Sequence, residues 1–370
     1  MKYTTLLFFF FVISCKNEVK EREWSAAMSA PYSYRIDGPR VNYYLKGKLI
    51  NSTSTLTSIG DFGWGHPDSA RNSGYGIAFP DSISVAYGGL NDRLQMCHYK
   101  GGAKLPVNRI KELFYKGYVC DGKEDNFNYI TAGLAPGGRV CVWVDFVEIK
   151  RFKVNLVDVY SEEPIIFFGD SLDKLKVNEY LKHHPIDYSI WEKPEKKHDI
   201  DFGFTSENES VISSAFWVIS NQGARKIIYE QMIKKRERNK SFNFDEVLKK
   251  ENETNRIILD NESQFMPKEL QYVWRYGKDF YQANIILSKD IQGFFLEPYI
   301  NAETGKSSNY QMIVLGIEND GTHGTVYFEG PGKKEKILSF KAGKYISKED
   351  GDTSEFYYPE IEYLFKKSNG

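Results

Sequence analysis

The chain contains a duplication on the scale of a whole domain, and this repeat restricts the possible folds more than any other feature. The residues from Pro80 to Tyr87 match those from Pro267 to Trp274 without a gap, and Ile110 to Phe114 match Ile291 to Phe295 in the same order. The separations of the two pairs of blocks differ by only six positions. A period of about 180 residues is too long for a solenoid repeat, so we expect two copies of one domain.

Each copy shows the same order of predicted elements. Alternating apolar residues from Ile83 to Tyr87 and from Leu94 to His98 flank a turn and predict a hairpin. Pro106 then begins a helix that Gly117 ends, and Ser288 is the predicted N-cap of the equivalent helix in the second copy. A second hairpin follows each helix. We therefore expect an α+β fold of two duplicated β-β-α-β-β units with mainly antiparallel sheets and a mixed connecting segment.

The connecting segment matches neither copy and is predicted to contain a strand over 165–168 and helices over 172–183 and 223–238. The whole chain is then divided into a leader (1–15), a charged tether (16–23), the first unit with an N-terminal extension (24–155), the connecting segment (156–262) and the second unit (263–370).

The leader is short and apolar. Lys2 precedes an apolar stretch that is too short to cross a bilayer and is typical of an export signal. It ends in Val12-Ile13-Ser14-Cys15, which resembles the lipobox of bacterial lipoproteins and implies that Cys15 carries lipid at the mature N-terminus. An ordinary signal peptide with an incidental cysteine is the alternative. Lys16, rather than aspartate, follows the lipobox and by resemblance to sorting rules favours the outer membrane, with a periplasmic or surface-facing body.

The charges of the chain nearly cancel, with 49 Lys and Arg against 50 Asp and Glu. This balance gives no field that favours nucleic acid, so the expected membrane contact runs through the N-terminal lipid. No phosphate-binding or dinucleotide-binding glycine motif is present, and no Cys/His spacing fits a zinc site. We therefore expect neither a cofactor nor a metal.

Three cysteines remain beyond the leader: Cys97, Cys120 and Cys141. In an oxidising compartment a Cys97–Cys120 disulfide is possible and would close a loop of about 24 residues, adding roughly 3–4 kcal/mol. Cys141 would then be a buried thiol in a strand. Three unpaired cysteines in the core are the alternative.

The stretch from Gly133 to Trp143, with its Pro-Gly-Gly turn before Val-Cys-Val-Trp, is similar to a known family. Together with the lipobox and Leu105-Pro106, it resembles the bacterial lipoprotein family called domain of unknown function 2931. The resemblance implies an envelope lipoprotein. It implies no activity, catalytic residue or ligand.

Three short motifs also resemble those of the SGNH (GDSL-type) esterases. The resemblance would make Ser171 the nucleophile, His323 a base oriented by Asp320, and Gly169 and Asn91 the oxyanion donors. However, the Gly-x-Asn-Asp motif precedes the serine here, whereas it follows the serine in that family. The duplication also assigns the motifs around Asn91 and His323 to tight turns. The esterase is therefore the alternative to a binding protein.

A long glycine-rich and aromatic loop between Ile59 and Phe79 is the better candidate for function. Long loops with aromatic residues on a rigid sheet are common binding elements, and the candidate residues are Asp61, Trp64, His66 and Tyr75. The alternative is that Trp64 packs into a small satellite core. We expect a non-enzymatic, lipid-anchored envelope protein that binds either an envelope protein or a glycan through such loops.

Overall fold

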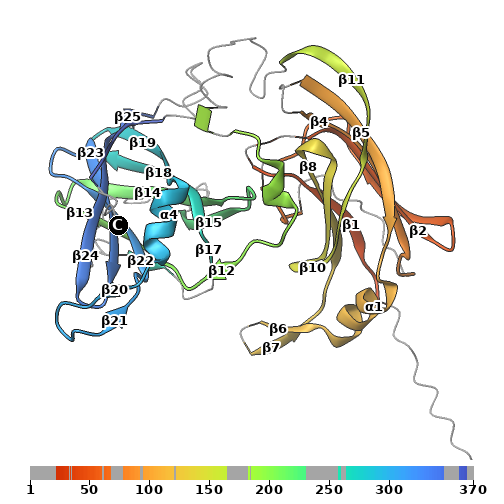
Figure 1. Ribbon diagram of the computed structural model, residues 1–370, viewed down its shortest axis with the longest axis horizontal. Coiled ribbons are helices and arrows are strands. Elements are labelled where there is room, and N and C mark those ends of the chain that lie inside the picture. The colour runs from red at the N-terminus through yellow and green to blue at the C-terminus, as the bar shows by residue number, and fades with distance from the viewer. Residues whose placement is uncertain are drawn as a thin grey trace, which may run out of the picture.

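The computed structural model describes residues 22–32, 34, 36–60, 62–67, 78–91, 95–120, 122–164, 182–183, 185–230, 257–259, 264–345 and 358–364. These residues are mostly β-strand and form two bodies, each built from two sheets (Figure 1). Only two α-helices lie wholly within the described part of the chain. The expected α+β class is therefore wrong.

The first body pairs a four-stranded sheet with a five-stranded sheet. Both sheets are antiparallel except for one parallel pair, β1 with β8. The four-stranded sheet has the order β1 (Ser25–Ser29), β8 (Tyr129–Ala135), β9 (Arg139–Val144) and β10 (Val147–Lys153). The five-stranded sheet has the order β11 (Asn155–Pro164), β5 (Gln95–Lys104), β4 (Ser82–Leu90), β2 (Asp37–Leu45) and β3 (Lys48–Ser54).

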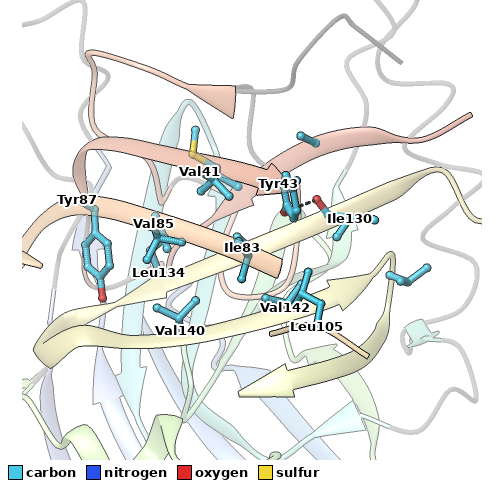
Figure 2. Packing of buried hydrophobic residues seen from close by; sticks show 14 of the residues in the cluster. Val41, Tyr43, Ile83, Val85, Tyr87, Leu105, Ile130, Leu134, Val140 and Val142 are labelled. Atoms are coloured by element: carbon cyan, nitrogen blue, oxygen red, sulfur yellow. Dashed lines mark hydrogen bonds between the residues drawn. The ribbon is translucent and has the colours of Figure 1, made fainter. Parts of the chain in front are cut away.

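The core of the first body lies between these two sheets (Figure 2). Ile83 and Val85 of β4 pack toward Leu134 of β8, as the alternation of apolar residues along each strand requires. Two tyrosines also cross the core, because the Tyr43 hydroxyl donates to the Ile130 carbonyl (2.9 Å). The Tyr87 hydroxyl donates to a second carbonyl of β8 (2.8 Å). Each hydroxyl is thereby satisfied inside an apolar core.

The second body repeats this arrangement with a core of its own. Its one parallel pair is β13 with β22. One sheet has the order β16 (Ile257–Leu259), β13 (Asp201–Ser206), β22 (Met312–Ile317), β23 (His323–Gly330), β24 (Lys333–Lys341) and β26 (Glu360–Tyr363). The other has the order β15 (Arg225–Glu230), β14 (Val211–Ser220), β18 (Pro267–Tyr276), β19 (Asp279–Ile286) and β25 (Gly343–Lys344).

The strand orders show what is repeated. β1-β8-β9-β10 corresponds to β13-β22-β23-β24, and β3-β2-β4-β5 corresponds to β15-β14-β18-β19. The predicted β-β-α-β-β unit is wrong because its two hairpins belong to opposing sheets and each sheet takes further strands from earlier in the chain. β13, β14 and β15 come from the predicted connecting segment, yet they pair within the sheets of the second body.

The helix predicted over 223–238 is also wrong where the structure describes it. Arg225–Glu230 is β15, a strand at the edge of a sheet that pairs with β14. Ile227 in this strand is exposed. The strand predicted over 165–168 and most of the helix predicted over 172–183 lie outside the described residues.

The two predicted helices are confirmed, and each lies at one end of its body. α1 (Val107–Lys116) buries Ile110, Leu113 and Phe114, and Gly117 follows it with φ +65°. α4 (Lys289–Leu296) is capped by Ser288, whose hydroxyl accepts a hydrogen bond from the backbone N–H of Ile291 (3.4 Å). None of the described helices is long and apolar enough to cross a membrane.

Short elements complete the bodies. They are the hairpin of β6 (Tyr118–Cys120) and β7 (Lys123–Asp125), the hairpin of β20 (Tyr299–Ile300) and β21 (Ser307–Ser308), the pair β12 (Lys197–His198) and β17 (Gln264–Phe265), and the 3₁₀ turns η1 (Pro136–Gly138) and η2 (Tyr188–Trp191).

Candidate functional site

The glycine-rich loop of the first body lies where the two bodies meet. Trp64 is only 5% exposed and packs edge-to-face on Trp143 of β9, with 5.1 Å between the ring centroids. Both rings belong to a small satellite core that also contains Tyr34, Cys141 and Trp191. Trp64 therefore has the packing role that was the alternative interpretation of this loop, and its ring is not an exposed binding surface.

Gln222, in the turn between β14 and β15, connects the second body to this core. Its Oε1 accepts hydrogen bonds from Trp64 Nε1 (3.0 Å) and Arg151 Nη2 (3.3 Å). Its Nε2 donates to the carbonyls of Ile190 (2.5 Å) and Lys193 (2.6 Å). The indole and the guanidinium only donate and the carbonyls only accept, so the partners fix the orientation of the amide. One buried side chain thus joins three segments to the second body.

The backbone of the same turn adds further hydrogen bonds across the junction. The carbonyl of Gly223 accepts from the N–H groups of Trp64 (2.9 Å) and Tyr32 (3.0 Å), and Gly63 forms an antiparallel bridge with Ala224. Gly223 has φ +81°, and a Cβ on it would lie 2.8 Å from a side-chain carbon of Pro31. Only glycine allows this approach of the two backbones.

The carboxylate of Glu195 accepts hydrogen bonds from the same β14–β15 turn. Its Oε2 accepts from the Ser220 hydroxyl (2.7 Å), and its Oε1 accepts from the backbone N–H of Asn221 (2.9 Å). Burial raises the pKa of Glu195 above its ordinary value, although these hydrogen bonds oppose the shift. The junction thus contains a carboxyl group whose ionisation is disfavoured.

Beside the buried contacts, the junction presents a surface that we call the junction rim: Phe62, Trp217, Arg225 and Ile227. The bridge between Gly63 and Ala224 places Phe62 across from Arg225. The Arg225 guanidinium carbon lies 5.0 Å from the ring of Trp217, and Trp217 pairs directly with Ile227. Phe62 is 54% exposed and Ile227 is 53% exposed. Two apolar side chains thus reach solvent beside a stacked arginine and tryptophan.

The same face of the sheet carries polar residues that are buried. Gln271 pairs with Trp217 on one side and with Asn284 on the other, so the three share one face. Gln271 Nε2 donates to Glu269 Oε1 (3.0 Å), and Asn284 accepts from Gln282 (3.0 Å). These four polar residues are almost fully buried. They support one another and are not at the surface.

The other predicted residues of the loop are placed unevenly. His66 lies at the surface, and partial desolvation together with the Lys226 ammonium lowers the pKa of its imidazole. Asp61 and Tyr75 lie outside the described residues, as does Cys15. Of the loop candidates, the structure therefore places Trp64 and His66 at the junction.

Two cysteines are buried in strands of the first body. Cys141 lies in β9, as predicted for a core thiol, and burial raises its pKa. Cys97 lies in β5, and its thiol donates to the carbonyl of Gln95 (3.5 Å). The side chain of Cys120 is outside the described residues, so a Cys97–Cys120 disulfide stays a prediction.

The residues of the esterase alternative lie in different bodies. Asn91 follows β4 of the first body, and its side-chain amide donates to Gln95 (2.9 Å). Asp320 and His323 form a hydrogen-bonded pair at the β22–β23 turn of the second body. Backbone N–H groups of Thr322 and His323 also donate to Asp320 (2.9 Å each), and these bonds lower its pKa although desolvation alone would raise it. Gly169 and Ser171 lie outside the described residues.

Metal ligation has no candidate in the described ranges, where no three His, Cys, Asp or Glu side chains gather in a way that would hold an ion. The residues that sequence reasoning missed are Gln222 and Arg225. Their segment contains an Asn-Gln-Gly turn after an apolar strand, which is a signal for a hairpin rather than for the helix we predicted. No sequence signal identifies the surface against which that turn packs.

Comparison with known proteins supports a family but no activity. The family model "Protein of unknown function (DUF2931)" matches residues 14–260, which is more than half of the chain. No curated protein and no solved structure matches the chain. The matched range contains the first body and extends through the junction turn to β16 of the second body. This chain belongs to the DUF2931 family of proteins of unknown function.

Proposed function

We propose that this protein is a non-catalytic, lipid-anchored envelope protein that binds a protein partner through the junction rim. The anchor is supported by the lipobox-like Val12-Ile13-Ser14-Cys15 at the end of the leader. The observation that supports binding is the exposure of Phe62 and Ile227 together, next to the stacked Arg225 and Trp217.

The composition of the rim favours a protein interface. Aromatic residues and arginine are enriched at the centres of such interfaces, where they contribute most of the binding energy. The backbones beneath Phe62 and Ile227 are fixed by the Gly63–Ala224 bridge and by the pairing of β14 with β15. Side chains on a fixed backbone lose little conformational freedom on binding, which favours affinity.

A protein partner fits the rim better than a glycan does. Sugar recognition requires amide and carboxylate groups that a ligand can reach. On this face those groups belong to Glu269, Gln271, Gln282 and Asn284, which are buried, whereas the exposed side chains are apolar.

The experiment uses a photo-crosslinking amino acid placed at position 62 or 227 in the full-length protein in its native cells. Leu56, an apolar residue with 98% exposure that lies outside the rim, provides the matched control position. We expect one discrete protein adduct from positions 62 and 227 and none from position 56. Identical adducts from all three positions, or none from the rim, would exclude this site. Binding of oligosaccharides with a change in tryptophan fluorescence would favour the glycan.

The esterase alternative keeps one supporting observation, the Asp320–His323 pair. It requires cleavage of p-nitrophenyl esters that Ser171→Ala abolishes. A wild-type protein without such cleavage would eliminate it.

A further inference from the structure

The end of the first body where the described chain begins carries a cluster of exposed apolar side chains. Val119, on the β6–β7 hairpin, is 69% exposed, and Phe146, on the β9–β10 turn, is 64% exposed. Tyr115, near the end of α1, is also exposed. We call these three residues the end cluster.

The end cluster is held in place by the fold. The ring of Phe146 packs edge-to-face on Tyr118 (5.0 Å between centroids). The carboxylate of Asp145 accepts hydrogen bonds from the backbone N–H groups of Asn128 (2.7 Å) and Tyr129 (3.1 Å), which fixes the turn that carries Phe146. A Cβ on Gly117 would lie 2.5 Å from the carbonyl oxygen of Asp125, so the hairpin is pressed against the end of α1.

The chain enters the body at this same end. The N–H of Ser25, the first residue of β1, donates to the carbonyl of Asn128 (2.8 Å), and Asn128 is itself bonded to Asp145. Only nine residues, Lys16 to Trp24, separate Ser25 from Cys15. A fully extended chain between Cys15 and Ser25 spans at most about 35 Å.

We propose that this end of the first body rests on the lipid surface, with the side chains of Val119, Phe146 and Tyr115 inserted at the bilayer interface. The inference rests on the proposed lipid anchor at Cys15, because the short tether keeps this end of the body nearest to the membrane. Aromatic side chains favour the interfacial region of bilayers.

The equivalent elements of the second body also carry exposed apolar side chains, Leu296 of α4 and Ile300 of β20. In Figure 1 the β6–β7 and β20–β21 hairpins both lie toward the lower edge of the molecule. The opposite end of the first body lies farther from the proposed lipid surface than the end cluster does, by the length of β4, about 30 Å.

The charges around the cluster indicate which lipid property matters. Between Val107 and Asp125 the chain has four basic and four acidic residues, so this segment has no net charge. Attraction to anionic headgroups therefore contributes little, and the contact depends on apolar insertion. We expect binding to change less than about threefold between phosphatidylcholine vesicles and vesicles that contain phosphatidylglycerol.

The test places p-benzoylphenylalanine at position 119, 146 or 56 of the full mature chain, acylated at Cys15 and reconstituted in vesicles. Leu56 is the matched control because it is apolar, exposed and located beyond the end of β3 that pairs with Arg40, away from α1. We expect lipid adducts at positions 119 and 146 at least about tenfold above position 56, as expected for one buried apolar side chain. Equal adducts at all three positions, or none, would overturn the proposal.

A second arm separates the end cluster from the anchor. The mass of the native protein reports whether Cys15 is acylated. A protein without acylation would refute the lipid anchor but not the end cluster. The unacylated mature chain is then sedimented with vesicles, where Val119→Ser combined with Phe146→Ser should lower the bound fraction at least about tenfold and Leu56→Ser should not change it. An unchanged bound fraction in the double variant would refute the end cluster even if Cys15 is acylated.

Discussion

Replacing Gln222 with methionine removes four hydrogen bonds from the junction while keeping the length and nearly the volume of the side chain. The variant leaves the Trp64 indole N–H and one Arg151 N–H without their acceptor, and the carbonyls of Ile190 and Lys193 without their donor. A buried hydrogen bond contributes about 1 kcal/mol, and an unsatisfied buried group costs at least that much. We therefore expect Gln222→Met to destabilise the closed junction by about 4 kcal/mol.

Hydrogen exchange measures this loss locally. The amides of Tyr32 and Trp64 both donate to the carbonyl of Gly223, so they exchange only when the junction opens. A cost of about 4 kcal/mol predicts exchange roughly a thousandfold faster at these two amides, with little change in the core strands of either body. Gln311→Met, at an exposed glutamine, is the matched control. If the Tyr32 and Trp64 amides exchange at the same rate in both variants, Gln222 does not hold the junction.

Three further experiments, with four substitutions, test the packing and the electrostatics. Gly133→Ala would place a Cβ 2.4 Å from the ring of Trp143 and should lower the free energy of unfolding by about 2 kcal/mol or more. Gly293→Ala, with open space around it in α4, should raise the free energy of unfolding by about 0.5–1 kcal/mol. Thermal unfolding measures both changes. Tyr87→Phe removes a buried hydroxyl bond to β8 and should cost about 1 kcal/mol in urea denaturation, and a neutral result would contradict its role. The raised pKa of Glu195 means that the folded state holds its proton more tightly, so stability should fall as pH rises from about 4.5, and Glu195→Gln should remove that slope.

The local elements of this fold were predictable because they depend on short-range patterns. The alternation from Ile83 to Tyr87 identifies a strand with one buried face, and the spacing of apolar residues after Pro106 identifies α1. The same patterns do not show which sheet covers that face. The parallel pairs β1–β8 and β13–β22 each join strands about a hundred residues apart, so the sandwich could not be derived from neighbouring residues.

The candidate site was predictable only as a segment. Composition identified the loop around Trp64 as unusual, but its structural role depends on Gln222, which lies 158 positions away. The alternating polar residues at Glu269, Gln271, Gln282 and Asn284 are typical of an exposed face in a sequence, yet the structure buries all four. Burial of a polar face is a property of the assembled bodies and leaves no local signal.

The two copies contact each other through unlike surfaces, so the junction has a direction. A turn of the second copy packs on a loop of the first, and such a head-to-tail contact would allow a third copy to add in the same way. The equivalent β2–β3 turn of the first copy has Lys46 before Gly47, where the second copy has Gln222 before Gly223. Lysine has no acceptor for an indole or a guanidinium, so this turn cannot form the same junction. By sequence, residues 231–263 of the second copy contain neither glycine nor tryptophan, so the Gly63-Trp64-Gly65 motif of the first copy has no counterpart there. The contact therefore forms in one direction only, from the Gln222 turn of the second copy to the Trp64 loop of the first.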